Sequence, residues 1–244
     1  MRIEKPFKAF KDARVIVSVL YRFPDITRYS IDTILSIIQN DSNTWLVLIN
    51  NAGDPAISNY IASISHPRCI TFELPFNFGK ALAANFFFRE YINETNIPKT
   101  VVSLDPDTVF SKESYTALVS AVEHLPQCGM IGMRFTKNNC NPERNLFFGP
   151  KTIKDKQGTQ YQITCPFMCT VAGPVLAVAG QKIWKECKNE LFPKKFIKVY
   201  GGDDSALYNA LRWKYINGYL EGTEATHLVS GVKRAPEFEN RLKH

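Results

Sequence analysis

The first 135 residues alternate between short apolar runs and amphipathic segments, and this alternation constrains the fold more than any other feature. Apolar runs rich in β-branched residues predict strands at residues 14–20, 45–50, 68–75, 100–105 and 128–135. Helical periodicity or helix start signals predict helices at residues 26–40, 55–65, 79–93 and 112–125. Strands that alternate with helices predict an α/β fold, with a mostly parallel central sheet and helices on both of its faces.

The pattern becomes less regular after about residue 136. The polar stretch 136–162 predicts a loop or a small hairpin over a site, and residues 166–184 predict a strand followed by the start of a helix. Two glycines and two aspartates at 201–204 open a segment that predicts a helix ending at Gly218. With 244 residues and no repeats, we expect one domain over 1–244.

The composition is that of a globular protein, with 45% hydrophobic and 22% charged residues. The six cysteines show no C-x-x-C spacing, so we expect reduced thiols and no zinc site. The basic N-terminus lacks the apolar core of a signal peptide, and no apolar run approaches the ~20 residues of a membrane span. These features predict a soluble, cytoplasmic protein.

The net charge of +7 includes six lysines between Lys182 and Lys198, against two glutamates in the same stretch. A basic surface attracts the phosphates of a nucleotide, a lipid headgroup or a nucleic acid. Such a stretch is equally typical of a solvated helix face and a loop. Peripheral contact with a phosphate-rich surface is therefore an open expectation.

Asp105 and Asp107 flank a proline at the end of the apolar run VVSL. Two carboxylates at this position need a cation, a proton-transfer role or water, because burying an unpaired charge is costly. Mg²⁺ and Mn²⁺ prefer oxygen ligands and commonly bridge carboxylates to phosphates. The alternative is a simple turn in which Asp107 caps the chain. Ligands of α/β sheets bind beyond the carboxyl ends of the strands. We expect the residues along this rim to include Tyr21, Arg22, Asn50, Asn51, Asn77 and Asp105.

From about Arg14 to His227 the chain resembles the nucleotide-sugar glycosyltransferases of the GT-A fold, particularly the family 2-like group. The resemblance rests on five loose motifs in the family's order: VIVSVLYRFPD, VLINNAGDP, NFGKALAAN, the D-x-D of Asp105 and Asp107, and Gly173-Pro174 followed by Gly202-Asp203-Asp204. It implies a nucleotide-sugar-binding half over about 14–135 and an acceptor-binding and catalytic half over about 136–244.

The resemblance also implies roles for individual residues. Asp107 would hold the metal beside the donor diphosphate, with Asp105 nearer the ribose or the metal, and a late histidine, His227, would complete the site. Asp204 would be the general base of an inverting transfer, and Asp203 matches the acid that precedes it in the family. Both acids could instead cap a helix, and His227 could be a surface residue.

The donor nucleotide, a UDP- or GDP-sugar, would lie against a further set of residues. Tyr21 and Arg22 would border the base, and Lys80 would reach a phosphate unless it is simply exposed. Asn50 stands where the family usually has an aspartate that forms a hydrogen bond with the base. An amide both donates and accepts hydrogen bonds, so the identity of the base stays open. The remaining donor-site candidates are Asn51, Asn77 and Gly173.

The sequence therefore predicts a metal-dependent transferase that moves one sugar to an acceptor hydroxyl. The acceptor would be a glycan, a lipid-linked sugar, a protein or hydroxylated bases in DNA. A sugar-1-phosphate nucleotidyltransferase is the alternative enzyme, although LYRFPDI lacks the glycine-rich phosphate loop expected after its first strand. A non-catalytic nucleotide-sugar or glycan-binding module is the third possibility.

Overall fold

The computed structural model describes residues 8–136, 149–166, 170–171, 173–196 and 203–228. Residues 1–7 and 229–244, at the two ends of the predicted domain over 1–244, lie outside these ranges. Lys198 and Gly202 also lie outside them. The described chain forms one ten-stranded sheet in the order β3-β2-β1-β4-β9-β6-β10-β8-β7, with β5 paired to β10 off this path. In these described ranges no helix is long and apolar enough to cross a membrane.

The first half of the sheet is parallel. β1 (Arg14–Leu20) pairs with β2 (Thr44–Asn51) and β4 (Thr100–Leu104), and β2 pairs with β3 (Cys69–Leu74), all in parallel register. The helices α1 (Pro24–Ile38), α2 (Pro55–Ser63) and α3 (Lys80–Tyr91) follow the first three strands. The alternating pattern of the sequence predicted these elements, and the α/β fold is confirmed.

The second half adds antiparallel strands to this parallel core, so the whole sheet is mixed. β9 (Val175–Ala179) lies antiparallel between β4 and β6 (Cys128–Phe135), and β6 pairs in parallel with β10 (Ile216–His227). The short β5 (Thr108–Phe110) runs antiparallel to the end of β10. β7 (Lys151–Lys154) and β8 (Gln160–Thr164) form the predicted small hairpin, which extends the sheet at its edge next to β10.

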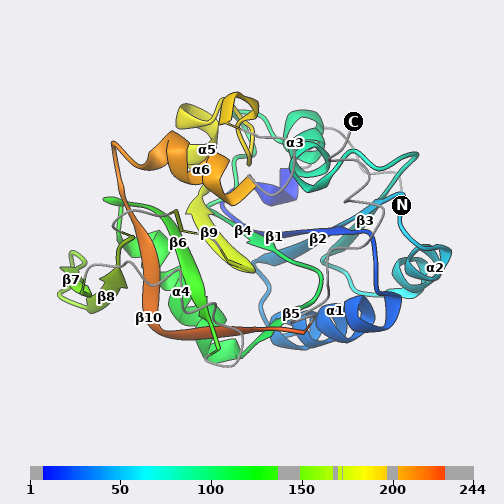
Figure 1. Ribbon diagram of the computed structural model, residues 1–244, viewed down its shortest axis with the longest axis horizontal. Helices are drawn as coiled ribbons and strands as arrows, with labels where there is room; N and C mark the ends of the chain where they lie inside the picture. The colour runs from blue at the N-terminus through cyan, green and yellow to red at the C-terminus, as the bar shows by residue number, and fades with distance from the viewer. Residues whose placement is uncertain (1–7, 137–148, 167–169, 172, 197–202, 229–244) are drawn as a thin grey trace, which may run out of the picture.

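Helices lie on both sides of the sheet (Figure 1), and a hydrophobic core packs against each of its faces. The side chains of β1 contribute to both cores, since Ile16 and Leu20 face one core and Val15 and Val17 face the other. The first core packs under α1, α2 and α4 (Lys112–His124). The second packs under α3, α5 (Gly180–Glu186) and α6 (Asp203–Leu211). Short 3₁₀ turns lie at Lys8–Phe10 and Lys194–Phe196.

The prediction of a helix that ends at Gly218 is wrong. α6 ends at Leu211, and β10 already begins at Ile216. A Cβ at Gly218 would lie only 2.5 Å from the carbonyl oxygen of Thr164, so this glycine permits the close approach of β10 to β8 rather than capping a helix. Ser111 caps α4, because its side chain accepts a hydrogen bond from Ser114 N at 3.1 Å.

Candidate active site at the carboxyl edge of the sheet

The acidic pair lies in the tight connection between β4 and β5. The backbone N of Asp105 donates to the carbonyl oxygen of Pro174 at 2.8 Å, which fixes the start of the turn. The backbone N of Leu228 donates to the carbonyl oxygen of Asp107 at 2.7 Å. Because β5 pairs with the end of β10, His227 lies opposite Thr108 and is brought beside the turn.

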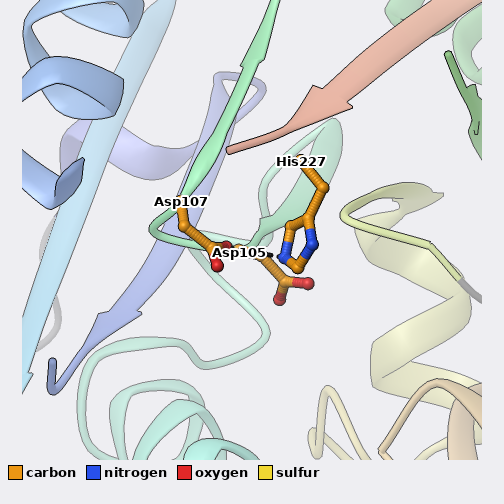
Figure 2. A group of neighbouring side chains, drawn as sticks. All are labelled: Asp105, Asp107 and His227. Carbon is orange, nitrogen blue, oxygen red and sulfur yellow. Dashed lines mark ion pairs between the residues drawn. The ribbon is translucent and has the colours of Figure 1, made fainter. Parts of the chain in front are cut away.

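Asp105, Asp107 and His227 point toward one another (Figure 2), and each offers one ligand atom within 4.8 Å of the others. His227 Nε2 lies 2.9 Å from Asp107 Oδ1. This hydrogen bond with Asp107 raises the pKa of His227 above its usual value. Two carboxylates and an imidazole fit Mn²⁺, and the carboxylates also fit Mg²⁺. The three residues that the sequence suggested as metal ligands therefore form one partly buried cluster.

Lys80, the first residue of α3, joins this cluster to the aspartates of α6. Its Nζ lies 2.7 Å from Asp105 Oδ1, 3.1 Å from Asp203 Oδ2 and 3.9 Å from Asp204 Oδ1. Burial disfavours the ammonium, but the carboxylates outweigh it and hold the pKa of Lys80 well above its usual value. Lys80 is therefore a partly buried counter-ion rather than an exposed lysine.

Asp204 lies at the start of α6 with its two oxygens in different surroundings. Oδ2 accepts a hydrogen bond from Gly173 N at 3.2 Å, and among the described residues none donates a hydrogen bond to Oδ1. Burial raises the pKa of Asp204 to about 7, against the opposing effect of Lys80. A carboxylate with a free oxygen and a pKa near neutrality has the properties of a general base.

Asn51 and Asn77 hold the loop that leads into α3. Asn51 Nδ2 donates to Asn77 Oδ1 at 2.7 Å, while Asn51 Oδ1 accepts from Phe78 N at 2.9 Å. Asn77 Oδ1 also accepts from Gly79 N at 2.8 Å, and Gly79 adopts a positive φ of 79° just before the helix. In this structure the two asparagines therefore position Lys80.

Asn50 is 1% exposed, and its amide is occupied by neighbouring residues. Its Nδ2 donates to Ser58 Oγ and to Glu73 Oε2, both at 2.8 Å, and its Oδ1 accepts from Gly53 N at 2.9 Å. Glu73 stands opposite Asn50 in the β2–β3 register and is exposed. Glu73 was not among the predicted site residues, although an acid near the end of a predicted strand was a signal.

Tyr21 and Arg22 follow β1, between the Asn50 region and the acidic turn in the strand order. Both are partly buried, and the Arg22 guanidinium carbon lies 5.2 Å from the centre of the Tyr21 ring. The Arg22 carbonyl oxygen accepts a hydrogen bond from Thr27 Oγ1 at 2.9 Å, which anchors the turn into α1. The pair lies just beyond the end of β1, and its contact with a base stays a prediction.

Comparison with known proteins gives structural matches but no sequence match. No family model matches the chain, and no curated protein matches it either. A mannosyltransferase from Pyrobaculum calidifontis, PcManGT, solved with GDP-Man and Mn²⁺, matches with a TM-score of 0.63 at 14% identity. That match covers 96% of this chain and 61% of the mannosyltransferase chain.

Two further structures match over most of the chain. GalNAc-T7, solved with UDP, GalNAc and Mn²⁺, has a TM-score of 0.63 at 10% identity, covering 89% of this chain and 44% of its own. Residues 1–349 of S. aureus TarS match with a TM-score of 0.56 at 9% identity, covering 88% of this chain and 60% of its own. This chain thus spans less than two thirds of each matched chain. It has the fold of the GT-A glycosyltransferases.

Proposed function

We propose that the protein is a metal-dependent glycosyltransferase that moves one sugar from a nucleoside-diphosphate sugar to an acceptor hydroxyl. The observation that carries this proposal is the convergence of Asp105, Asp107 and His227 beside Lys80 and Asp204, at the carboxyl edge of a GT-A sheet. The matched structures with GDP-Man and with UDP support a GDP- or UDP-sugar as the donor.

The departing diphosphate requires positive charge in the site. Asp107 and His227, together with Asp105, would hold Mn²⁺ or Mg²⁺. When bound, such an ion offsets the charge that develops on the leaving group. Lys80 would add a second cation: its ammonium, now shared among carboxylates, would bind a phosphate oxygen of the donor.

The acceptor hydroxyl requires a base, because its pKa is high. We assign this role to Asp204, whose free Oδ1 would take the proton as the acceptor oxygen bonds to the anomeric carbon. The bond from the anomeric carbon to the diphosphate breaks at the opposite side, and its electron pair leaves with the diphosphate. The anomeric configuration is inverted as a result.

Two neighbours would position this base. Gly173 N fixes Asp204 Oδ2, which leaves Oδ1 on the side of Lys80, 3.9 Å from its Nζ. Asp203 binds Lys80 at 3.1 Å and would keep the ammonium near the phosphates. Asp203 would therefore act through Lys80 rather than on the substrate. We therefore propose that residues 14–135 bind most of the donor, with His227 completing the metal site, and that the acceptor binds the part of the chain after residue 136.

The acceptor remains a set of candidates: a glycan, a lipid-linked sugar, a protein or hydroxylated bases in DNA. Exposed lysines support acceptors that carry phosphate, and they stand at positions 185, 188, 194 and 195. Binding to DNA would weaken steeply with added salt, because it depends on counterion release. A neutral glycan acceptor would show no such dependence.

A panel of nucleotide sugars, each tested with Mn²⁺, checks the proposed function. The true donor should raise the melting temperature by mass action and be slowly hydrolysed by the wild-type protein. Asp204→Asn should keep the thermal shift and lose the hydrolysis. Release of pyrophosphate from a nucleoside triphosphate and a sugar 1-phosphate would instead identify a nucleotidyltransferase. Unchanged turnover in Asp107→Ala and Asp204→Asn would contradict the assigned roles, and no thermal shift with any sugar nucleotide would reject the proposal.

A further inference from the structure

Glu73 presents a carboxylate that neighbouring side chains hold in place at the carboxyl edge of the sheet. It accepts a hydrogen bond from Asn50 Nδ2 at 2.8 Å and a longer one from Ser58 Oγ at 3.4 Å. Within the described residues, both of these bonds end on Oε2. Oε1 keeps its lone pairs, and the residue is exposed. Glu73 is thus an oriented acceptor open to a ligand.

Asn50 cannot itself offer a free donor to a ligand in this arrangement. Both hydrogens of its amide are used, by Ser58 and Glu73, and its oxygen is already bonded to Gly53 N. Gly53 leaves no space for a side chain, since a Cβ there would lie 2.7 Å from Asn50 Oδ1. Asn50 therefore acts as a positioning residue, and the group at this site that can accept new hydrogen bonds is Glu73.

The distance from Glu73 to the acidic turn suits a nucleotide. Glu73 is on β3, and Asp105 follows β4, three places along the order β3-β2-β1-β4. Neighbouring strands lie about 4.8 Å apart, so the separation across the edge is roughly 14 Å. That is of the order of the span from the diphosphate to the base in an extended nucleoside diphosphate. Tyr21 follows β1, on the path between the two ends.

We propose that Glu73 recognises the base of the donor through hydrogen bonds and that this base is guanine. The inference rests on the proposed function, which places the diphosphate at the acidic turn. An ionised carboxylate only accepts hydrogen bonds, so its best partner is an edge that only donates. Guanine presents N1–H and N2–H₂ side by side, and a carboxylate accepts from both.

The other bases fit this carboxylate less well. Uracil has one N–H flanked by two carbonyl oxygens, and the Asn50 amide, already occupied by Ser58 and Glu73, offers those oxygens no hydrogen. Adenine and cytosine each place a ring nitrogen acceptor beside their amino group. The amino group can donate a hydrogen bond to the Glu73 carboxylate, but the ring nitrogen is repelled by it. A site built to pair with a donor edge discriminates strongly against bases that lack it, because its polar groups are left unpaired.

Calorimetric titration of the Mn²⁺-loaded protein with GDP, UDP, ADP and xanthosine diphosphate tests the inference without an activity assay. For the wild type, we expect GDP to bind about tenfold or more tightly than the other three. In Glu73→Gln the amide group supplies a donor, so GDP should lose this advantage and xanthosine diphosphate should gain. Xanthine carries a carbonyl oxygen where guanine carries its amino group.

Glu94→Gln is the matched control, because Glu94 is exposed in the loop before β4, away from the carboxyl edge. It should leave the preference for GDP unchanged. Ratios of affinities between bases cancel any general effect on folding or on diphosphate binding. Tighter binding of UDP by the wild type, or an unchanged ratio in Glu73→Gln, overturns the inference and leaves the glycosyltransferase proposal standing. Failure of every nucleoside diphosphate to bind overturns both.

Discussion

His227 Nε2 lies 2.9 Å from Asp107 Oδ1, so the end of β10 is joined to the turn that follows β4. The antiparallel pairing of β5 with β10 sets this distance, because it places His227 opposite Thr108. An imidazole and a carboxylate at this separation attract a proton in the absence of a metal, and the same atoms can bind a cation in its place.

Competition between the proton and the metal predicts that Mn²⁺ binding depends on pH. The hydrogen bond with Asp107 raises the pKa of His227, so a proton remains bound at a higher pH than on a free imidazole. Mn²⁺ affinity should therefore fall as the pH is lowered from about 8 to about 6. Titration calorimetry at several pH values measures this dependence.

His227→Gln and Asp107→Ala separate the two contributions. Asp107→Ala should weaken Mn²⁺ binding by more than about tenfold at any pH. His227→Gln should weaken it less at low pH than at high pH, because the titrating ligand is gone. An affinity that does not change with pH in the wild type would contradict the assignment of His227 as a ligand.

Loss of the Lys80 charge should destabilise the protein in a pH-dependent way. Lys80→Met leaves Asp105, Asp203 and Asp204 without their shared cation, which we expect to cost about 1–3 kcal/mol near pH 8. Burial already raises the pKa values of Asp105 and Asp204, and loss of the Lys80 charge should raise them further. The penalty is therefore absent at low pH and grows as the pH rises.

Urea unfolding of Lys80→Met at about pH 5 and about pH 8 measures this effect. Lys80→Arg keeps the charge and should lose much less stability at the higher pH. Equal losses of stability at the two pH values would show that packing of the Lys80 side chain, and not its charge, stabilises this region.

The sequence predicted the parallel half of the sheet because each of its strands is a local apolar run followed by a helix. β10 was missed because its residues, INGYLEGTEATH, form no apolar run, and its partners β6, β8 and β5 are distant in the chain. The resemblance nevertheless pointed to His227 as the third ligand, and the tertiary structure brings it to the aspartates.

Other parts of the site depend on contacts that the sequence does not encode locally. Lys80 bridges to Asp203 and Asp204 because α3 and α6 cover the same face of the sheet, an arrangement that local periodicity could not give. Glu73 meets Asn50 only through the register of β2 and β3. The sequence therefore offered the individual polar residues, while their pairings followed from the sheet.

Asp204→Asn should stabilise the protein while it removes transfer activity. The folded-state pKa of Asp204 is raised to about 7 by burial, above its usual 3.8. The ionised form is therefore disfavoured on folding, with a cost that appears as the pH rises from about 4 to about 7. A neutral amide avoids this cost, and we expect a gain of about 1–2 kcal/mol at pH about 8 and little gain at pH about 4.

The activity of the wild-type protein should depend on the same ionisation of Asp204. Turnover should decline as the pH falls below about 7, because the base must be ionised to accept the acceptor proton. Thermal melts give the stability of Asp204→Asn, and initial rates give the pH profile. Full activity of Asp204→Asn would remove this residue from the chemistry.

Asn50→Asp should destabilise the protein near neutral pH. The new carboxylate would stand where Nδ2 now lies 2.8 Å from Glu73 Oε2, at a position that is only 1% exposed. Two acids in contact, with the donor lost, should cost about 2–4 kcal/mol, and part of this should return at about pH 5 as a proton is shared. Chemical unfolding at the two pH values checks the prediction.

Asn59→Asp, an exposed change on α2, is the matched control and should be nearly neutral. If Asn50→Asp were as stable as the wild type at neutral pH, the Asn50–Glu73 hydrogen bond would not hold in solution. Glu73 would then lack the orientation on which the proposed recognition of guanine depends.

An anomalous difference map from crystals grown with Mn²⁺ and GDP is the most direct test of the proposed metal site. We expect one manganese peak against Asp107 and His227, in contact with the diphosphate, with Lys80 turned toward a phosphate oxygen. A bound nucleotide with no manganese at Asp107, or manganese bound only elsewhere, would contradict this proposal.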